Sequence, residues 1–361
     1  MVAPAAHNDD DIPMDPTNTT AYLVCTIVLL FGGLFGNLLL IGTVLTFKNL
    51  RSVNNIFITN LVLADCASLV LLDAFSILGI VKRGEGILNY GSRSCKVISY
   101  FYLSAMVCSV WSLASCAVHI YIRVCHKSLY KVIYTAQSVS VIIFWIWTLC
   151  PMIVLPSMMG WGSHGYDTRL MHCTFDYTAS YSFTYFLLAM GSWIPFIIVA
   201  YCTIRTLKFI QHSKCEVQPA AACFVDNAAA ATCLADNAAA IVAAANEEAN
   251  TEPRQLSTTN DEKDRNSDTE SPCDLCILLA VMAVTLSLLI GWATMTFIWL
   301  LDKNKQWGAT EFVFAIMMAN SPSSINGIVY AMVNKNFRRR YLRLSCHPCR
   351  MYLASGKGVF I

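Results

Sequence analysis

The stretch "AYLVCTIVLLFGGLFGNLLLIGTVLTF", residues 21–47, has no charged side chain in 27 positions. A helix needs about 20 consecutive, mainly apolar residues to cross the hydrocarbon core of a bilayer. It also satisfies its own backbone hydrogen-bonding groups, as hydrocarbon requires. Six further stretches meet the same requirement, at residues 54–80, 96–124, 136–158, 180–208, 274–301 and 309–333. The sequence therefore predicts an all-α membrane protein, a bundle of seven transmembrane helices.

The composition agrees with this fold class. Of the 361 residues, 56% are hydrophobic and 13% are charged, and the mean hydropathy is +0.52, whereas a soluble domain carries roughly 25% charged residues. The net charge is only +2 and no basic stripe carries interleaved aromatic residues, so we expect no nucleic-acid partner. The chain shows no nucleophile–base pattern, and "CDLC" at 273–276 lacks the second pair of ligands that a zinc site needs. We therefore do not expect an enzyme.

The seven spans divide the chain into five regions. We expect an extracellular tail at 1–20, transmembrane helices one to five at 21–214, a third cytoplasmic loop at 215–272, helices six and seven at 273–333, and a short amphipathic eighth helix with a cytoplasmic tail at 334–361. The loop begins with an alanine-rich repeat, which favours a continuation of the fifth helix; the alternative is low-complexity filler. Its acidic second half is too polar to fold alone.

Lysine and arginine gather at one set of helix ends, which includes Lys48, Arg123, Lys208 and Arg338. By the positive-inside rule this side faces the cytoplasm. We therefore expect a multi-pass protein of the cell membrane with an extracellular N-terminus. The first 20 residues do not resemble a cleaved signal peptide, and Asn18 opens an N-glycosylation sequon in the exposed tail.

Most of the 16 cysteines lie within spans or on the cytoplasmic side, where thiols stay reduced and serve as small apolar residues. Cys95 and Cys173 fall on the extracellular side, which predicts one disulfide between them. Near the C-terminus, the run at 334–344 should lie along the membrane surface in contact with lipids. Cys346 and Cys349 follow it at positions suited to palmitoylation.

Polar residues inside a bilayer are costly and mark functional positions. Here they form a series: "GN" at 36–37, "NLVLAD" at 60–65 and "NGIVY" at 326–330, followed by "NKNFRRRYLRL". The series resembles that of the rhodopsin-like (class A) G-protein-coupled receptors over nearly the whole chain, except the tail and the long loop. Within that class, "AVHIY…CH" (117–126), "CTF" (173–175) and "NGIVY…NKNFRRRY" (326–341) are most similar to the melatonin-receptor branch, and related orphan receptors share these features.

The resemblance implies a receptor that binds a small-molecule ligand and signals through a heterotrimeric G protein, with arrestin as a further partner. An apolar and aromatic pocket of this kind is typical of small hydrophobic ligands. The alternative is that its residues simply pack the bundle. The implied pocket residues are Tyr102, Leu103, Met106, Trp292, Met295, Thr296, Trp299, Phe312, Ile316 and Asn320.

Four positions argue against the better-known ligands of the class. Tyr102 stands where amine receptors carry an aspartate, so a charged monoamine has no counter-ion there. Asn320 stands where opsins carry the retinal-binding lysine. Ser157 and Tyr177 stand where the resemblance expects the melatonin-contacting asparagine and glutamine. On this alignment we expect neither retinal nor melatonin.

Four residues correspond to the family's sodium-binding positions: Asp65, Ser109, Ser323 and Asn326. A hard cation prefers such oxygen ligands. Pro322 replaces one asparagine of the usual set, so the alternative is a water-filled hydrogen-bond network around the carboxylate. Apart from this sodium ion we expect no cofactor.

The switch that closes the third helix departs from the family pattern. The Asp/Glu-Arg-Tyr triplet of the family reads His119-Ile120-Tyr121 here, with Ile120 25 residues after Cys95. Isoleucine lacks the charged guanidinium fork that pairs with carboxylates. Arg123 lies one turn further on roughly the same face, where it either reaches a partner or only anchors the helix at the membrane surface.

The other switch positions are partly retained. The sixth helix lacks the family's proline, but Thr294 can bend it by bonding to the carbonyl four residues earlier. The seventh helix keeps Asn326 and Tyr330. The altered switch leaves two alternatives: an atypical receptor that recruits arrestin or traffics without G-protein turnover, and a seven-span transporter or lipid-moving protein. Inverted repeats with broken helices would favour transport, and the sequence shows none.

Overall fold

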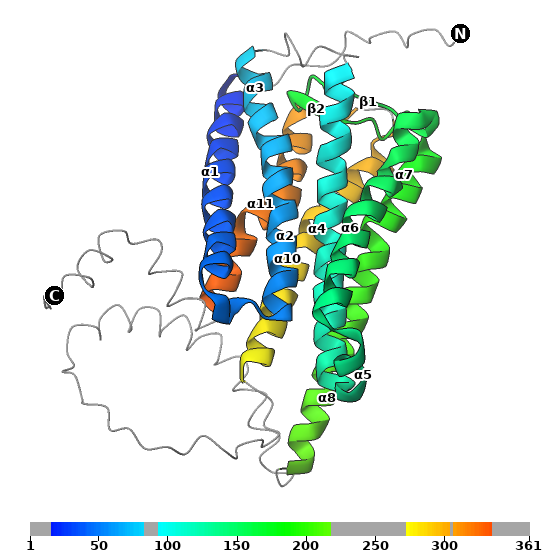
Figure 1. The fold of residues 1–361 in the computed structure, drawn as a ribbon. Helices are drawn as coiled ribbons and strands as arrows, with labels where there is room; N and C mark the ends of the chain where they lie inside the picture. Colours follow the sequence, from blue (N-terminus) through cyan, green and yellow to red (C-terminus); the bar gives the residue numbers. More distant parts are fainter. Residues whose placement is uncertain (1–15, 83–92, 218–271, 304–305, 334–361) are drawn as a thin grey trace, which may run out of the picture.

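The computed structural model describes residues 16–82, 93–217, 272–303 and 306–333. In this part of the chain seven helices are long and apolar enough to cross a membrane, and they stand side by side as one bundle (Figure 1). The predicted seven-span, all-α fold is therefore confirmed. The predicted third loop, the eighth helix, Cys346 and Cys349 lie outside the described residues, apart from a few residues at the loop's two ends.

Several spans are built from more than one helical segment. The first is α1 (Pro16–Thr46), which begins five residues before the predicted start and so includes Asn18. The others are α2 (Val53–Leu69) with η2 (Val70–Ala74) and α3 (Phe75–Lys82); α4 (Arg93–Cys125); α6 (Ala136–Pro156) with η4 (Ser157–Trp161); α7 (Tyr181–Leu188) with η5 (Ala189–Trp193) and α8 (Ile194–Val217); α10 (Pro272–Leu301); and α11 (Ala309–Val333). Two short helices, η1 (Lys48–Leu50) and α5 (Lys127–Ile133), connect spans at one end of the bundle.

The third span, α4, is the centre of the bundle and packs against α2, α6 and α8. Asn60 on α2 links three of these helices, because it donates to Ser112 Oγ on α4 (2.8 Å) and accepts from Trp147 Nε1 on α6 (2.7 Å). A buried amide that is satisfied on both sides fixes the register of its neighbours. These bonds hold α4, which carries three of the predicted pocket residues and the predicted switch at 119–123.

A second polar contact joins α1 to α11. Asn37 donates to the Ser323 carbonyl (2.8 Å) and accepts from the Gly327 backbone N–H (3.1 Å). A Cβ atom at Gly327 would lie 2.6 Å from Asn37 Oδ1, so only glycine permits this close approach. Small residues commonly allow membrane helices to pack at such distances.

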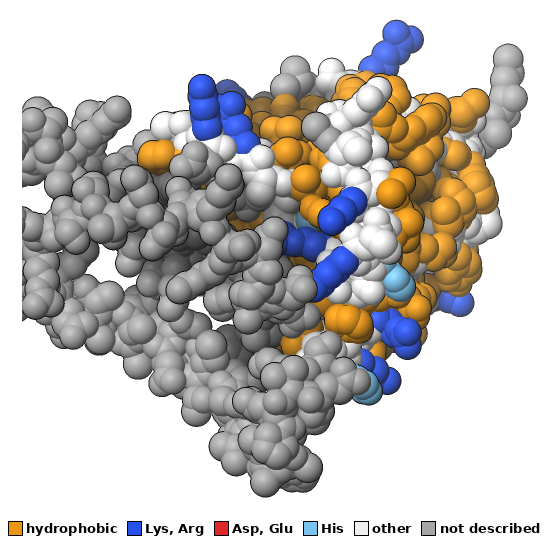
Figure 2. All heavy atoms as spheres, turned by 60° about the horizontal axis from the view of Figure 1, so that its bottom comes forward, with side chains coloured by type: hydrophobic (Ala, Val, Ile, Leu, Met, Phe, Trp, Pro, Cys, Tyr) orange, Lys and Arg blue, Asp and Glu red, His pale blue; other side chains and the backbone are white. Residues whose placement is uncertain are grey.

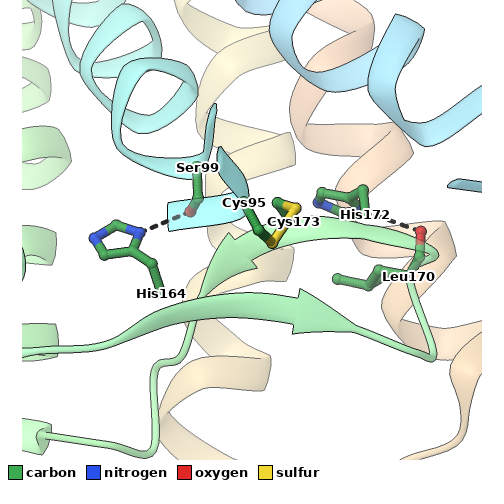
Figure 3. The surroundings of a disulfide bond; sticks show 6 residues. All are labelled: Cys95, Ser99, His164, Leu170, His172 and Cys173. Carbon is green, nitrogen blue, oxygen red and sulfur yellow. Dashed lines mark hydrogen bonds between the residues drawn. A yellow bond between two sulfur atoms is a disulfide. The ribbon is translucent and has the colours of Figure 1, made fainter. Parts of the chain in front are cut away.

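A β-hairpin covers one end of the bundle, which we call the disulfide end. Strands β1 (His164–Asp167) and β2 (His172–Phe175) are antiparallel, and Tyr166 pairs with Cys173. A disulfide joins Cys173 to Cys95 in the first turn of α4 (Figure 3), so the predicted bond is confirmed. Because α4 is the central helix, this bond holds the hairpin over the middle of the bundle.

The opposite end, which we call the basic end, has a different surface. Figure 2 shows Lys and Arg side chains on this face, and none of the described residues presents an Asp or Glu side chain there. The sequence places Lys48 in η1 after α1, Arg123 in the last turn of α4 and Lys208 in α8, all on the predicted cytoplasmic side. The predicted orientation therefore turns the basic end toward the cytoplasm.

Three spans contain a turn of π-helix, in η2, η4 and η5. Such turns are often found at functional sites, and η2 contains the buried Asp73. In α10, Thr294 donates to the Gly291 carbonyl (2.6 Å), three residues earlier. The prediction of a bond to the carbonyl four residues earlier is wrong, because a threonine hydroxyl reaches either carbonyl according to its rotamer.

Candidate functional site

A small cavity lies beneath the hairpin, between α4, α10 and α11. Seven of the ten predicted pocket residues line it, and its volume is about 20 Å³, which is room for one water. Thr296, Phe312 and Asn320 are buried nearby but do not line it. The lining residues are Tyr102, Leu103, Met106, Trp292, Met295, Trp299 and Ile316, joined by Thr174, Phe175 and Ala319.

The three additional lining residues were not predicted from the sequence. Thr174 and Phe175 directly follow Cys173, whose disulfide holds them over the bundle. The predicted disulfide could therefore have indicated that these two residues reach the cavity. Ala319 lies three residues after Ile316 on α11, which is the spacing that places two side chains on one helix face.

Aromatic rings close the cavity from above. The Phe175 and Trp299 centroids lie 5.9 Å apart, and Tyr177 stacks on both Trp299 (6.3 Å) and Phe312 (5.7 Å). Trp292 forms the floor, with its ring edge-on to Trp299 at 6.5 Å. Trp292 Nε1 is buried without a hydrogen-bond partner in the described part of the chain, so the pocket offers an unused donor.

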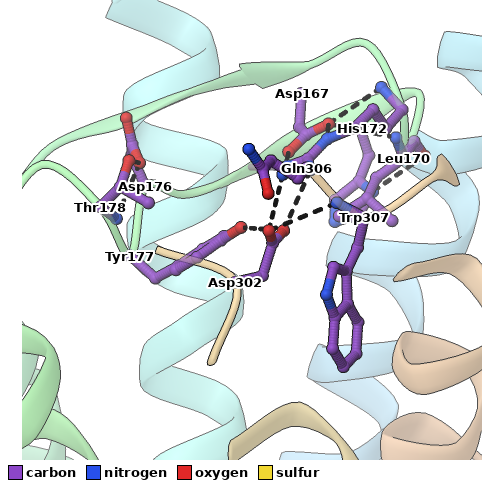
Figure 4. A network of polar contacts seen from close by, with 10 residues as sticks. Asp167, Leu170, His172, Asp176, Tyr177, Thr178, Asp302, Gln306 and Trp307 are labelled. Atoms are coloured by element: carbon purple, nitrogen blue, oxygen red, sulfur yellow. Dashed lines mark hydrogen bonds and ion pairs between the residues drawn. The ribbon is translucent and has the colours of Figure 1, made fainter. Parts of the chain in front are cut away.

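A network of polar contacts lies between the hairpin and Asp302, the residue that follows α10 (Figure 4). We call it the Arg169 cluster, formed by Asp167, Arg169, Tyr177 and Asp302. Arg169 Nη2 lies 3.0 Å from Asp167 Oδ2, Arg169 Nη1 lies 3.8 Å from Asp302 Oδ2, and Tyr177 donates to the same Asp302 oxygen (3.1 Å). The guanidinium also lies 4.1 Å above the Phe312 ring. The cluster ties the hairpin to α10 and α11.

The charges within this cluster support one another. Burial alone lowers the pKa of Arg169, but the neighbouring Asp167 carboxylate outweighs it and raises the pKa above its ordinary value. Burial also raises the pKa of Tyr177, so its hydroxyl keeps the proton that it donates to Asp302. Breaking one partner of such a buried ion pair leaves an uncompensated charge, which is strongly destabilising.

His164 and Ser157 form a second contact of the hairpin. His164 is 3% exposed, and its Nδ1 lies 2.7 Å from Ser99 Oγ (Figure 3). Its Nε2 lies 2.6 Å from Ser157 Oγ. Burial, with the nearby charge of Lys96, lowers the pKa of His164 to about 4. Ser157 therefore supports β1 and does not line the cavity.

The four predicted sodium-site residues come together in the core as the Asp65 network. Asp65 Oδ1 accepts from Ser109 Oγ (2.6 Å) and Ser323 Oγ (2.9 Å), and Asp65 Oδ2 accepts from Asn326 Nδ2 (2.7 Å). Asn326 Oδ1 has no hydrogen-bond partner among the described residues. One carboxylate, two hydroxyls and one unused amide oxygen are a donor set that fits a hard cation.

At the basic end, the predicted switch residues divide between the core and the surface. His119 is fully buried among aromatic rings that we call the His119 cluster. Its ring centroid lies 5.5 Å from that of Phe57, 5.5 Å from that of Tyr130 and 4.7 Å from that of Tyr134. Ile120 is 4% exposed and packs into the hydrophobic core. The cluster and Ile120 thus form an apolar and aromatic contact near the basic end of α4.

The other switch residues lie around these two. Tyr121 OH lies 3.0 Å from His126 Nε2, and its ring is 6.1 Å from that of Tyr201 on α8. Arg123 is half-buried and close enough for its charge to act on His119. Tyr330 is buried, and its hydroxyl has no hydrogen-bond partner within the described ranges.

An open apolar groove of about 650 Å³ runs along the outside of the bundle between α10 and α11. Phe297 and Phe314 line it and are more than half exposed, so the groove faces the surrounding bilayer and not the mouth of the bundle. None of the ten predicted pocket residues lines it.

Two buried polar groups near the pocket, Asp73 and His172, were not predicted. A charge in the middle of an apolar span marks a functional position, and Asp73 within "VLLDAF" was therefore detectable. His172 depends on the fold of the hairpin and had no such signal.

Comparisons with known proteins agree with this architecture. The model of the family described as 7 transmembrane receptor (rhodopsin family) matches residues 36–330. Melatonin receptor type 1A-A of Danio rerio is 24% identical over 96% of this chain and 86% of its own length, and melatonin receptor type 1B of Homo sapiens is 26% identical over 92% and 80%. The crystal structure of squid rhodopsin has the same fold, with a TM-score of 0.69 at 15% identity over 96% of this chain and 86% of that chain. The chain belongs to the rhodopsin family of seven-transmembrane receptors.

Proposed function

We propose that this protein is a cell-membrane receptor that binds a small-molecule ligand between α4, α10 and α11 and activates a heterotrimeric G protein at its basic end. The position of the Asp65 network carries the proposal. Along α4, Ser109 lies between the pocket residue Met106 and the switch at His119. Along α11, Asn326 lies between Ile316 and Tyr330. A ligand that moves either helix therefore also acts on this network.

The size of the cavity indicates how a ligand would act. A cavity of about 20 Å³ excludes any ligand of more than a few atoms. The ligand therefore binds a second arrangement, in which the aromatic side chains around Trp292 have moved apart. It shifts the population toward that arrangement by its higher affinity for it.

The switch works by packing in place of an ion pair. Ile120 and the His119 cluster hold the resting arrangement through buried apolar and aromatic contacts. When these contacts open, Arg123 meets carboxylate and carbonyl groups of the G protein. In this proposal the Asp65 network also holds a sodium ion. Asn18 carries a glycan, and lipids lie along the outer groove between α10 and α11.

The second candidate is an atypical receptor that recruits arrestin without G-protein turnover. The burial of Ile120 favours it, because no guanidinium stands at the family's arginine position. Membership in a receptor family supports both candidates over the transporter that the sequence left open.

The pocket is tested in cells that carry G-protein activation sensors and receive a small-molecule library and tissue extracts. Met106→Trp fills the cavity, while Phe101→Trp places the same ring on the outside of α4, where Phe101 is 53% exposed. At equal surface level we expect a stimulated signal that Met106→Trp abolishes and Phe101→Trp retains. A stimulated signal that survives Met106→Trp would contradict the pocket, and arrestin recruitment without G-protein activation would select the second candidate.

A further inference from the structure

Asp73 is a carboxylate buried within the second span. It lies in the π-helical turn η2 and is 4% exposed. An ionisable side chain at such depth requires a partner, because its charge has lost its water. In the described ranges the ion pairs at the disulfide end join Arg169 to Asp167 and Asp302, and none includes Asp73.

The neighbouring hydroxyl groups do not satisfy Asp73. Its Oδ2 atom has no hydrogen-bond partner among the residues that the structure describes. Ser76, one turn further, donates to the Leu72 carbonyl (2.8 Å), and Tyr22 on α1 donates to the Leu170 carbonyl (3.4 Å). The hydroxyl of Tyr102 interacts with the Asn320 side chain. The donors around the carboxylate are therefore engaged elsewhere.

A second unused acceptor lies on the hairpin above. His172 Nδ1 is 3.1 Å from the Leu170 carbonyl, which can only accept, so Nδ1 carries the proton and Nε2 presents a lone pair (Figure 3). Burial lowers the pKa of His172, which keeps the ring neutral. Nε2 has no hydrogen-bond partner within the described residues, and the ring lies edge-on to Tyr102 at 6.4 Å.

Tyr102 connects both acceptors to the candidate pocket. Its ring lines the cavity, it contacts His172, and it lies within electrostatic range of Asp73. Tyr102 itself offers no charge, as the sequence indicates, but a carboxylate stands beside it on the neighbouring helix.

We infer that Asp73 is the counter-ion for an organic ammonium group, and that the ligand of this receptor is an amine with an aromatic or apolar body. This inference rests on the proposed ligand pocket. An ammonium group brings several N–H donors, which the unused acceptors Asp73 Oδ2 and His172 Nε2 lack. It also brings the positive charge that the Asp73 carboxylate lacks. Tyr22 and Tyr102 both lie within electrostatic range of Asp73, and aromatic rings beside the carboxylate favour a cation over a neutral group.

The test uses the purified full-length receptor in lipid nanodiscs and matched pairs of probes. Each pair is an arylalkylamine and its neutral N-acetyl derivative, namely phenethylamine and N-acetylphenethylamine, and tryptamine and N-acetyltryptamine. Binding is read as the concentration that gives half of the maximal rise in melting temperature. A hydrogen bond to a charged group contributes enough for us to expect at least about tenfold tighter binding of the amine of one or both pairs.

The variants separate the role of Asp73 from general effects. Asp73→Asn keeps the shape and removes the charge, and it should remove the preference for the amine. Glu311→Gln, which removes an exposed carboxylate at the start of α11, should leave the preference unchanged. If Asp73→Asn does not fold, the amine and the amide are compared on the natural chain and on Asp73→Glu, which retains the carboxylate. This comparison still shows whether the receptor prefers the amine.

Three results would overturn the inference: equal binding of amine and amide, no shift with either amine, or a preference that persists in Asp73→Asn. The proposed function is read separately, by G-protein activation. A receptor that binds amines through Asp73 but activates no G protein would refute the proposed coupling and leave the role of Asp73 intact.

Discussion

Asn326 on α11 donates to Asp65 on α2 at 2.7 Å, and so joins two residues that lie 261 positions apart in the sequence. Ser109 and Ser323 complete the contact on the other carboxylate oxygen. Three helices therefore share one buried charge. Any change in the spacing of α2, α4 and α11 must alter at least one of these bonds.

Sodium should stabilise the protein through this network. The oxygen atoms of Asp65, the two serines and Asn326 suit a hard cation, and a ligand that binds only the folded state raises the melting temperature. We expect sodium chloride to raise the melting temperature of the purified receptor above that in choline chloride of equal ionic strength. Asp65→Asn should remove the difference, while Glu311→Gln should keep it. Equal melting temperatures of the natural chain in the two salts would show that the network is a hydrogen-bonded core without a cation.

Acid should destabilise the disulfide end through His164. The pKa of His164 in the folded protein is about 4, below the ordinary 6.5, because of burial. Between pH 6.5 and 4 the unfolded chain binds a proton that the folded protein excludes, so stability that is present above pH 6.5 is lost as the pH falls. This loss amounts to about 3 kcal/mol for the one group.

The measurement is the melting temperature of the purified receptor at pH values from 7 to 4. His164→Gln retains a polar side chain between the two serines and should flatten part of the decline. His126→Gln, at an exposed histidine, serves as the control and should follow the natural chain. An unchanged decline in His164→Gln would mean that other groups cause the acid sensitivity.

The His119 cluster should restrain basal signalling. The ring centroid of Tyr134 lies 4.7 Å from that of His119 and 5.3 Å from that of Tyr130. Burial raises the pKa of the Tyr134 hydroxyl to about 12, so the ring that covers His119 is neutral. Tyr134→Ala removes the ring that covers His119, so we expect higher basal G-protein activation at equal surface level. Val132→Ala in the same segment is the control, because Val132 is 74% exposed. Lower or unchanged basal activation in Tyr134→Ala would contradict a resting state held by this packing.

Local composition predicted the seven spans, and the side of the membrane on which Cys95 and Cys173 fall predicted their disulfide. The meeting of Asp65 with Asn326 joins residues far apart in the sequence, and only the resemblance to the receptor family implied it. Sequence reasoning did not find the Arg169 cluster, because it joins a hairpin tip to two helix ends through tertiary contacts that no local pattern specifies.

The remaining differences have similar causes. The volume of the cavity depends on how rings from three helices and the hairpin interlock, which is not encoded in any one segment. The start of α1 at Pro16 depends on contacts such as the bond from Asn18 to Thr310 Oγ1 (3.2 Å). Asp73 interrupts the apolar pattern of its span and was detectable, but that pattern does not specify which side chains of other elements surround it.

The central claim is that this receptor activates a G protein with Ile120 at the family's arginine position. The most direct test is nucleotide exchange by purified G proteins of each major class, with the purified receptor in lipid nanodiscs. The natural chain should accelerate exchange by at least one G protein, Arg123→Ala should lose most of that acceleration, and Lys127→Ala, at a neighbouring exposed cation, should keep it. If only Ile120→Arg accelerates exchange while the natural chain does not, the claim is wrong.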